Sequence, residues 1–197
     1  MQAQSPDSPC PTSLAVVTVQ HGQPSYSFYR EGIADRDHTP ADLIALLCQH
    51  TPGVLHTGSL MLLPPEHDKT LEVLRAARAL GWRISVDTNL RPAMARDLPA
   101  YREAVMRAVA LADWVKASDE DLEHLAVPGV DALARAQHLL AANPQAHLLA
   151  LTLGAEGAWL LHRNGVQCFA KEAQPLQVVD TVGAGDSFLA GLLANLF

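Results

Sequence analysis

The stretch DTVGAGDSF, residues 180–188, lies between a short β-branched run and a segment with helical spacing. The run Gln177 to Val179 predicts a strand. The apolar residues that follow recur as on a helix with one buried stripe: Phe188, Leu189, Leu192, Leu193 and Leu196. Gly183 and Gly185 are therefore expected where a strand leads into a helix, because a missing Cβ permits a sharp turn and a close ligand. The unpaired N–H groups of such a first turn bind anions.

Asp186 stands in the predicted first helical turn, where a carboxylate is ordinary and stabilises the helix by about 0.3–1 kcal/mol. The stretch is not a P-loop, since no Gly-Lys-Ser/Thr follows, and Phe188 occupies the third glycine position of a dinucleotide fingerprint. As a whole, DTVGAGDSF resembles the C-terminal signature of the ribokinase-like (PfkB) carbohydrate kinases. The resemblance implies that Asp186 is the catalytic base. It also implies that the amides of Gly183, Ala184 and Gly185 form an anion hole for the transferred phosphoryl group.

The composition limits the partners of the chain. At 197 residues and 49% hydrophobic content, one domain with an aliphatic core is expected, and the net charge of −7 argues against nucleic acid or an anionic membrane as main partner. The three cysteines, Cys10, Cys48 and Cys168, have neither disulfide-framework nor zinc-site spacing, which fits a reducing cytoplasm. No stretch approaches a membrane span, and the nine histidines show no metal-binding spacing.

Helix and strand patterns alternate through most of the chain. Helices are expected at 40–48, 64–80, 101–111, 131–142 and in a short segment ending at 125, and strands at 54–57, 83–86, 114–116, 147–153, 158–161 and 166–169. This alternation predicts a mostly parallel sheet with ligands at the carboxyl ends of its strands. With the resemblance, the expected fold is a three-layer α/β/α ribokinase-like (Rossmann-like) sheet. A hairpin of 14–19 and 25–29 would add a partial β lid, and residues 1–11 read as a mobile leader.

Two segments carry the residues that the resemblance assigns to the sugar. The predicted strand 25–29 runs into Phe28-Tyr29-Arg30, whose aromatic-x-Arg pattern is similar to that of fructokinase and 2-keto-3-deoxygluconate kinase. The loop DTNLRP, residues 87–92, resembles the middle motif of the family, which implies that Arg91 faces the acceptor or its phosphate. Both segments also have purely structural explanations, as an aromatic-packed strand and as a turn with a solvated arginine. The resemblance thus implies sugar contacts by Phe28, Arg30 and Arg91, with a preference for fructose.

The nucleotide side of the site is implied by two further segments. Lys116-Ala117-Ser118 is similar to a fructokinase-like segment, and Thr152-Leu153-Gly154-x-x-Gly157 resembles the segment that lies along the ATP phosphates and ribose. We therefore expect Lys116, Ser118, Thr152, Gly154 and Gly157 to bind ATP, together with Gly183 and Gly185. Ser118 and Asp121 stand at the Asn-x-x-Glu positions of the family, both as substitutions, and the resemblance implies that Asp121 helps to place Mg²⁺ through water. The same two residues also predict a near capping box.

The resemblance covers residues 12–197 as a partial PfkB carbohydrate kinase domain. The glycine-rich substrate loop expected near the N-terminus and the segment that closes over adenine have no match. A sheet without these parts exposes apolar surface and unpaired edges, so the isolated chain is expected to be poorly soluble or catalytically silent. The expected parent is a cytoplasmic, ATP-dependent fructokinase-like enzyme. A homodimer is one candidate assembly of this parent. The alternatives are a 2-keto-3-deoxygluconate kinase or another family kinase, an inactive remnant, and a dinucleotide-dependent oxidoreductase.

Overall fold

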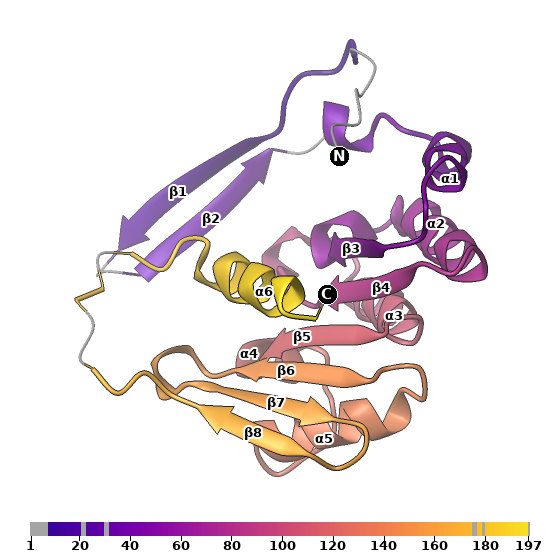
Figure 1. Cartoon of the computed structure of the whole chain (residues 1–197). Helices are drawn as coiled ribbons and strands as arrows, with labels where there is room; N and C mark the ends of the chain where they lie inside the picture. Colours follow the sequence, from indigo (N-terminus) through magenta and orange to yellow (C-terminus); the bar gives the residue numbers. More distant parts are fainter. Residues whose placement is uncertain (1–7, 21–22, 30–31, 175–176, 179, 197) are drawn as a thin grey trace. The chain divides into compact units, whose positions relative to one another are not determined.

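The computed structural model describes residues 8–20, 23–29, 32–174, 177–178 and 180–196, without the side chains of residues 19–20 and 23–28. The chain divides into two units, Met1–Thr51 and Pro52–Phe197. Each unit has its own secondary structure, and the predicted site residues from Arg91 to Asp186 all belong to the second (Figure 1).

The first unit holds a hairpin and one helix. Strands β1 (Leu14–Gln20) and β2 (Gln23–Tyr29) pair antiparallel, as predicted. Helix α1 (Pro40–Cys48) has the predicted bounds, because the Thr39 side chain accepts the Asp42 N–H at 3.2 Å and Pro40 suits the first helical position. Part of the predicted leader is anchored: the Pro11 carbonyl accepts the Ala34 N–H at 2.9 Å, while residues 1–7 lie outside the described part.

The second unit is built on a mixed six-stranded sheet. Its strands lie in sequence order: β3 (Val54–Gly58), β4 (Arg83–Asp87), β5 (Trp114–Ser118), β6 (Leu148–Thr152), β7 (Ala158–His162) and β8 (Gln167–Ala170). The first four run parallel, whereas β7 and β8 are antiparallel to their neighbours. Because β3 to β6 are parallel, their carboxyl ends meet at one edge of the sheet, and the loops that follow them share that edge.

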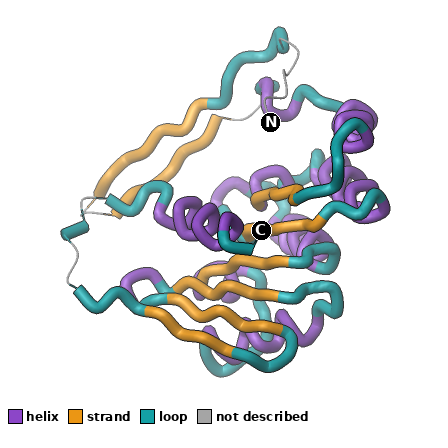
Figure 2. Tube along the Cα trace, in the orientation of Figure 1, coloured by secondary structure: helices purple, strands orange, loops and turns teal. Residues whose placement is uncertain are grey.

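Helices cover both faces of this sheet. One face carries α2 (His67–Ala79), α3 (Leu98–Val109), α4 (Asp119–His124) and α5 (Ala132–Ala142). The helix α6 (Ala184–Ala194) lies on the other face, alongside β4 and β5 (Figures 1 and 2). The predicted α/β class with a mostly parallel sheet is thereby confirmed, and the two faces with their helices form the three expected layers.

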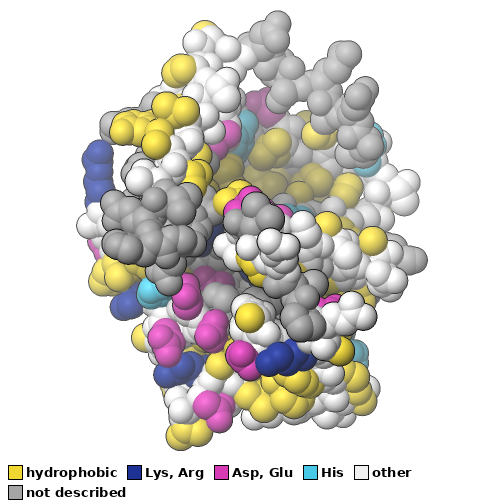
Figure 3. All heavy atoms as spheres, turned by 90° about the vertical axis from the view of Figure 1, so that its left-hand side faces the viewer, with side chains coloured by type: hydrophobic (Ala, Val, Ile, Leu, Met, Phe, Trp, Pro, Cys, Tyr) yellow, Lys and Arg dark blue, Asp and Glu magenta, His cyan; other side chains and the backbone are white. Residues whose placement is uncertain are grey.

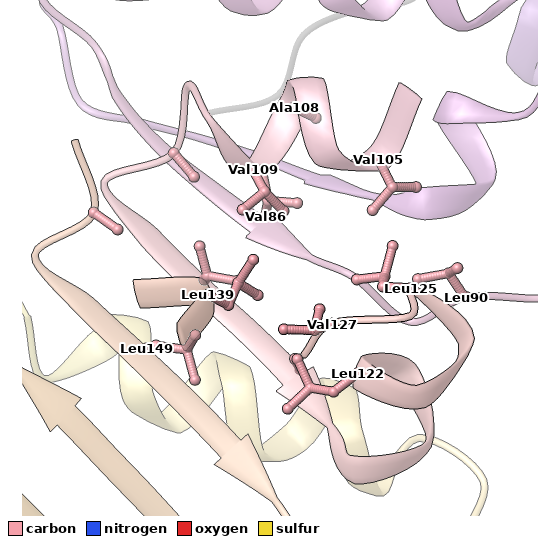
Figure 4. Close-up of a cluster of buried hydrophobic side chains, with 14 of the residues drawn as sticks. Val86, Leu90, Val105, Ala108, Val109, Leu122, Leu125, Val127, Leu139 and Leu149 are labelled. Atoms are coloured by element: carbon pink, nitrogen blue, oxygen red, sulfur yellow. The ribbon is translucent and has the colours of Figure 1, made fainter. Parts of the chain in front are cut away.

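The hydrophobic core fills the space between the sheet and the helices α2 to α5. Val86 and Leu149 point from the strands toward Val105 and Val109 of α3 and Leu139 of α5 (Figure 4). Each of these side chains is buried, and burying one such side chain stabilises the fold by about 1.5–3 kcal/mol. The core lies on the face away from α6, so polar side chains can occupy the α6 side of the same strands.

Three predictions of local structure are wrong, and one of them is the helix predicted at 101–111, which spans Leu98–Val109 instead. In the described part of the predicted strand 177–179, residues 177 and 178 have no regular structure, and Val178 is 64% exposed, because no described strand pairs with this segment. The helix predicted at 64–80 begins at His67, three positions later. Pro64 is followed by a second proline, which disfavours helical backbone at position 64, so the two prolines precede α2 instead of forming its first turn.

Candidate active site

The candidate site lies at the carboxyl edge of the parallel strands, beside the first turn of α6. The sheet register places Gly58, Asp87, Lys116 and Ala150 side by side on β3 to β6. Since alternate residues of a strand face opposite sides, Asp87 and Lys116 lie on the α6 face, while Val86 and Val115 enter the core. Figure 3 looks onto this edge, where acidic side chains are interspersed with Lys and Arg.

Asp87 and Lys116 form a buried ion pair across β4 and β5. Their exposures are 3% and 5%, and Nζ lies 3.1 Å from both carboxylate oxygens. Only Oδ2 receives a well-formed hydrogen bond, so Oδ1 keeps unused acceptor capacity. Burial raises the pKa of Asp87 to about 6, against the opposing effect of the ammonium, and the charges of Asp121 and Asp186 raise it further. Asp87 was not among the site residues predicted from the sequence.

The first turn of α6 presents free amides, as the glycine pattern predicted. Gly183 has a left-handed φ of 75°, and its carbonyl accepts the Ser187 N–H at 2.9 Å. Within the described part of the chain, the amides of Gly183 and Gly185 have no hydrogen-bond acceptor. The Ala184 N–H instead donates to the Thr181 carbonyl at 3.2 Å. Two of the three predicted anion-binding amides are thus free, and the third closes a turn.

Lys116 is the side chain that joins the sheet to this helix terminus. A Cβ built on Gly185 would lie 3.1 Å from Nζ of Lys116, which is closer than an ordinary van der Waals contact. The ammonium therefore borders the backbone of the second residue of α6. Free amides and a buried cation at one place favour an anion such as a phosphoryl group.

Asp186 is exposed in the first turn of α6, and its charge reaches two other groups. It raises the pKa of Asp87 and acts to raise that of His56. The pKa of His56 is nevertheless lowered, chiefly because surrounding protein partly desolvates its ring even though the residue is exposed at the surface. Lys116 lowers this pKa further, while the bond to Ser85 and the Asp186 charge oppose the shift. The Nδ1 atom of His56 lies 3.1 Å from the Ser85 hydroxyl. Four ionisable side chains, His56, Asp87, Lys116 and Asp186, therefore form one electrostatic group, the carboxyl-edge cluster.

The loop after β4 is held rigidly over this edge. The Thr88 N–H donates to the Lys116 carbonyl at 2.9 Å, and the Leu90 N–H donates to Oδ1 of Asp121 at 2.7 Å. Between them, Asn89 adopts a positive φ of 24°, and its carbonyl accepts the Ser59 hydroxyl at 2.6 Å. Asn tolerates the left-handed region better than most residues, so the DTN sequence suits this tight turn.

The residues predicted to bind the sugar are placed less completely. Arg91 is half-buried, and its Nη1 donates to the carbonyls of Leu90 at 3.0 Å and Asn89 at 3.4 Å, so the guanidinium bends back over its own loop. Arg30 and the side chain of Phe28 lie outside the described residues. Sugar contacts by these three residues therefore stay predictions.

Ser118 and Asp121 form a complete capping box at the start of α4. The Ser118 hydroxyl accepts the Asp121 N–H at 3.1 Å, and Oδ2 of Asp121 accepts the Ser118 N–H at 2.9 Å. Oδ1 accepts from Leu90, so both carboxylate oxygens are engaged by amides. No group of three His, Cys, Asp or Glu side chains in the described residues could hold a metal ion. A water-mediated role of Asp121 in placing Mg²⁺ stays a prediction.

The glycine segment after β6 forms a tight turn into β7. Thr152 is the cross-strand neighbour of Ser118, and Gly154 follows with a φ of 55° and open space around it. Gly157 has a φ of 110°, and a Cβ there would lie 2.4 Å from the Ala170 carbonyl. The hairpin alone thus requires glycine at 157, whereas the open position of Gly154 leaves its backbone accessible to a ligand.

No described helix combines the length and the apolar character that crossing a membrane requires.

A family profile described as "pfkB family carbohydrate kinase" matches residues 3–197. The chain is 41% identical over 194 residues to a fructokinase of Rhizobium leguminosarum bv. trifolii, covering 96% of this chain and 56% of the relative.

Solved structures give the same result. A fructokinase of Vibrio cholerae O395 with bound fructose, ADP and calcium ion superposes with a TM-score of 0.79 at 32% identity, covering 95% of this chain and 59% of that one. A fructokinase of Xylella fastidiosa with bound ATP has a TM-score of 0.75 at 30% identity, covering 96% and 57%. The chain thus spans a little over half the length of these relatives. From its fold, its C-terminal glycine signature and these matches, the chain belongs to the pfkB family of carbohydrate kinases.

Proposed function

We propose that the full-length protein transfers the γ-phosphoryl group of ATP to a sugar hydroxyl, with fructose as the preferred acceptor. One observation carries the proposal: the Asp186 carboxylate is exposed in the same helical turn as the free amides of Gly183 and Gly185. Such a turn offers a proton acceptor and an anion-binding backbone within one short segment. The fructokinase relatives support the choice of acceptor.

The chain's own groups divide the chemistry between them. Asp186 accepts the proton of the attacking hydroxyl as the bond to phosphorus forms, late in a loose transition state. The amides of Gly183 and Gly185 donate to the phosphoryl oxygens, on which negative charge gathers. Lys116, beside Gly185, adds a positive charge that is already fixed before the substrates arrive. Because these donors are preorganised, little reorganisation is needed during transfer.

The remaining predicted contacts concern the substrates. Thr152 and Gly154 would lie along the nucleotide phosphates and ribose, with Gly157 shaping the turn, and Ser118 would adjoin them at the end of β5. Mg²⁺ would neutralise the phosphates of bound ATP, and no step is assigned to it on the described residues. Phe28, Arg30 and Arg91 would hold the sugar. A cytoplasmic location and a homodimer of the full-length protein complete the proposal.

The function is tested by measuring ADP release from ATP and Mg²⁺ with separate acceptors. Fructose and 2-keto-3-deoxygluconate are offered to the purified full-length protein, and the phosphorylated product is identified by mass. The proposal expects fructose-dependent ADP release with the higher kcat/KM. Turnover with 2-keto-3-deoxygluconate alone would replace the acceptor, and no sugar-dependent ADP release would overturn the kinase function.

The isolated segment 1–197 is a separate question. Calorimetry on this segment with fructose and a non-hydrolysable ATP analogue distinguishes an active domain from an inactive remnant. Because residues 1–197 span only 56% and 59% of the length of two fructokinase relatives, we expect no sugar binding by these residues alone. Sugar binding of ordinary affinity would contradict this expectation.

A further inference from the structure

Asp87 has no role in the mechanism above, although it is the most deeply buried member of the carboxyl-edge cluster. It ends β4, and its cross-strand partner on β5 is Lys116. Because these two paired residues face the same side of the sheet, the Asp87 carboxylate lies 3.1 Å from Nζ of Lys116. Both exposures, 3% and 5%, are far lower than those of ordinary surface ion pairs.

A buried pair of this kind is costly for the fold. Removing two charges from water costs several kcal/mol per ion, and a pair of apolar side chains of similar size often stabilises a protein as well or better. Burial dominates the environment of Asp87, because it raises the pKa of this group to about 6 despite the neighbouring ammonium. Fold stability alone therefore gives weak grounds for an acid and a lysine at these positions.

The position of the Lys116 ammonium gives a better explanation of why this pair is present. Nζ sits 3.1 Å from where a Cβ of Gly185 would be, next to the free amide of the α6 terminus. Lysine is flexible, with four rotatable bonds, so a single charge on a long stem needs a partner to remain at one place. Asp87 is that partner, and the loop that follows it is fixed by Thr88, whose N–H donates to the Lys116 carbonyl at 2.9 Å.

We propose that Asp87 is a positioning residue that acts through Lys116: it holds the ammonium beside Gly185, where the transferred phosphoryl group is bound. This inference rests on the proposed kinase function, because it assigns the phosphoryl group to the α6 terminus. Asp87 itself needs no contact with either substrate. Its removal releases the ammonium from the position at which it stabilises the charge of the transition state.

A double-mutant cycle tests whether Asp87 acts through Lys116. In the full-length protein, kcat and KM for ATP and fructose are measured for Asp87→Asn, Lys116→Met and the double variant. We expect Asp87→Asn to lower kcat by about 10–100-fold, the usual loss from misplacing a reacting group. The double variant should then be no slower than Lys116→Met alone, since Asp87 has nothing left to position. Independent, multiplying losses of the two single variants would overturn the proposal.

Asp113 provides a matched control. It is equally buried at the opposite end of the sheet, where its carboxylate accepts the Ile84 N–H at 2.8 Å and lies 2.9 Å from Nη1 of Arg83. Asp113→Asn should lower thermal stability but keep kcat of the folded protein within twofold. An equal loss of kcat in Asp113→Asn and Asp87→Asn would show that any buried acid of the sheet has this effect and would overturn the proposal.

The pH profile supplies a readout that a merely structural role would not move. The ionisable groups around Asp87 are Lys116 on β5, Asp121 on α4 and Asp186 on α6, with His56 on the neighbouring β3. The wild-type kcat should fall as the pH drops through about 6, where Asp87 takes up a proton. This fall of kcat at low pH, the acid limb of the profile, should persist in His56→Gln and be absent in Asp87→Asn. An unchanged limb in Asp87→Asn would contradict the proposal even if its kcat were low.

Binding separates this proposal from the kinase function itself. Calorimetry compares the affinity of each variant for ADP and for a non-hydrolysable ATP analogue. We expect Asp87→Asn and Lys116→Met to reduce the preference for the triphosphate by the same factor, at least about fivefold, since both lose the fixed charge at the phosphoryl site. If the wild type binds the analogue but phosphorylates no sugar, the kinase proposal fails while this comparison still decides the role of Asp87. The positioning role of Asp87 would be overturned if Asp87→Asn kept the wild-type preference for the triphosphate while Lys116→Met lost it.

Discussion

The Oδ1 atom of Asp121 accepts the backbone N–H of Leu90 at 2.7 Å and so links the loop after β4 to the helix after β5. Its other oxygen accepts the Ser118 N–H within the capping box of α4. One buried carboxylate thus fixes two of the loops at the carboxyl edge. These contacts also keep the end of β4, and with it Asp87, next to Lys116.

We predict that Asp121→Ala destabilises the protein by about 3 kcal/mol, because two buried amides lose a charged acceptor and each such bond contributes about 1.5–3 kcal/mol. The free energy of unfolding in urea measures this change. Glu120→Gln in the same helical turn is the control, since Glu120 is exposed, and it should stay within about 0.5 kcal/mol of the wild type. Equal stabilities of the two variants would contradict the linking role of Asp121.

The pKa of Asp87 predicts a pH dependence of stability with a definite sign. Its folded-state pKa, about 6, lies above the ordinary value of 3.8, so the folded protein binds this proton more tightly than the unfolded chain. The resulting stabilisation is complete below about pH 4 and is lost as the pH rises through about 6. Relative to Asp87→Asn, the wild type should therefore gain about 1 kcal/mol of unfolding free energy from pH 7 to pH 5. A relative loss over this range would contradict the raised pKa.

Replacing both members of the buried pair should cost less than replacing Lys116 alone. Lys116→Met leaves the buried Asp87 carboxylate without its partner at pH 7, at a cost of about 3–5 kcal/mol. The double variant removes both charges and should unfold at or above the wild-type denaturant concentration at pH 7. Strictly additive destabilisation would show that the two side chains do not interact in the folded protein.

Two glycines of α6 offer a matched pair. Gly191 has open space around it, so Gly191→Ala should stabilise the protein by about 0.5–1 kcal/mol through helix propensity. Gly185→Ala gains the same propensity, but its Cβ presses on Nζ of Lys116 at 3.1 Å. We expect Gly185→Ala to lower kcat about tenfold or more, because it displaces the ammonium and narrows the anion site. Gly191→Ala should not affect kcat, and equal activities of the two variants would contradict this arrangement of Lys116.

The electrostatic reach of Asp186 can be measured directly. Its charge raises the pKa of both His56 and Asp87, so Asp186→Asn should lower both values. NMR titration of the His56 ring and the Asp87 carboxyl would show the two shifts. A change at neither group would place the Asp186 carboxylate farther from the sheet edge than the structure has it.

Sequence patterns predicted the parts of this fold that depend on neighbours in the chain. Helix α1 has the expected bounds because Thr39 and Pro40 define its start locally. The strand expected at 177–179 was wrong in its described part, since a strand needs a partner that a β-branched run cannot supply. The capping box at Ser118 was anticipated from spacing alone.

The ion pair of Asp87 and Lys116 could not have been found in this way. The two residues are 29 positions apart, and only the register of β4 and β5 brings them together. In the sequence, an acid after a strand reads as a turn former, because nothing local records its depth of burial. The turn that occupies the Ala184 amide was not expected either, although its acceptor, the Thr181 carbonyl, lies only three positions away. The free amides of Gly183 and Gly185 were expected.

The most direct test of the central claim compares Asp186→Asn with Asp180→Asn in the full-length protein. Asp180 is also exposed, and its Oδ1 accepts the Val182 N–H at 2.9 Å in the preceding turn, so the control changes an acid of the same segment. If Asp186 accepts the sugar proton, Asp186→Asn should lower kcat for fructose phosphorylation by about 10²–10⁴-fold while losing no more than about 1 kcal/mol of stability, whereas Asp180→Asn stays near the wild type. Unaltered turnover in Asp186→Asn would remove this carboxylate from the reaction.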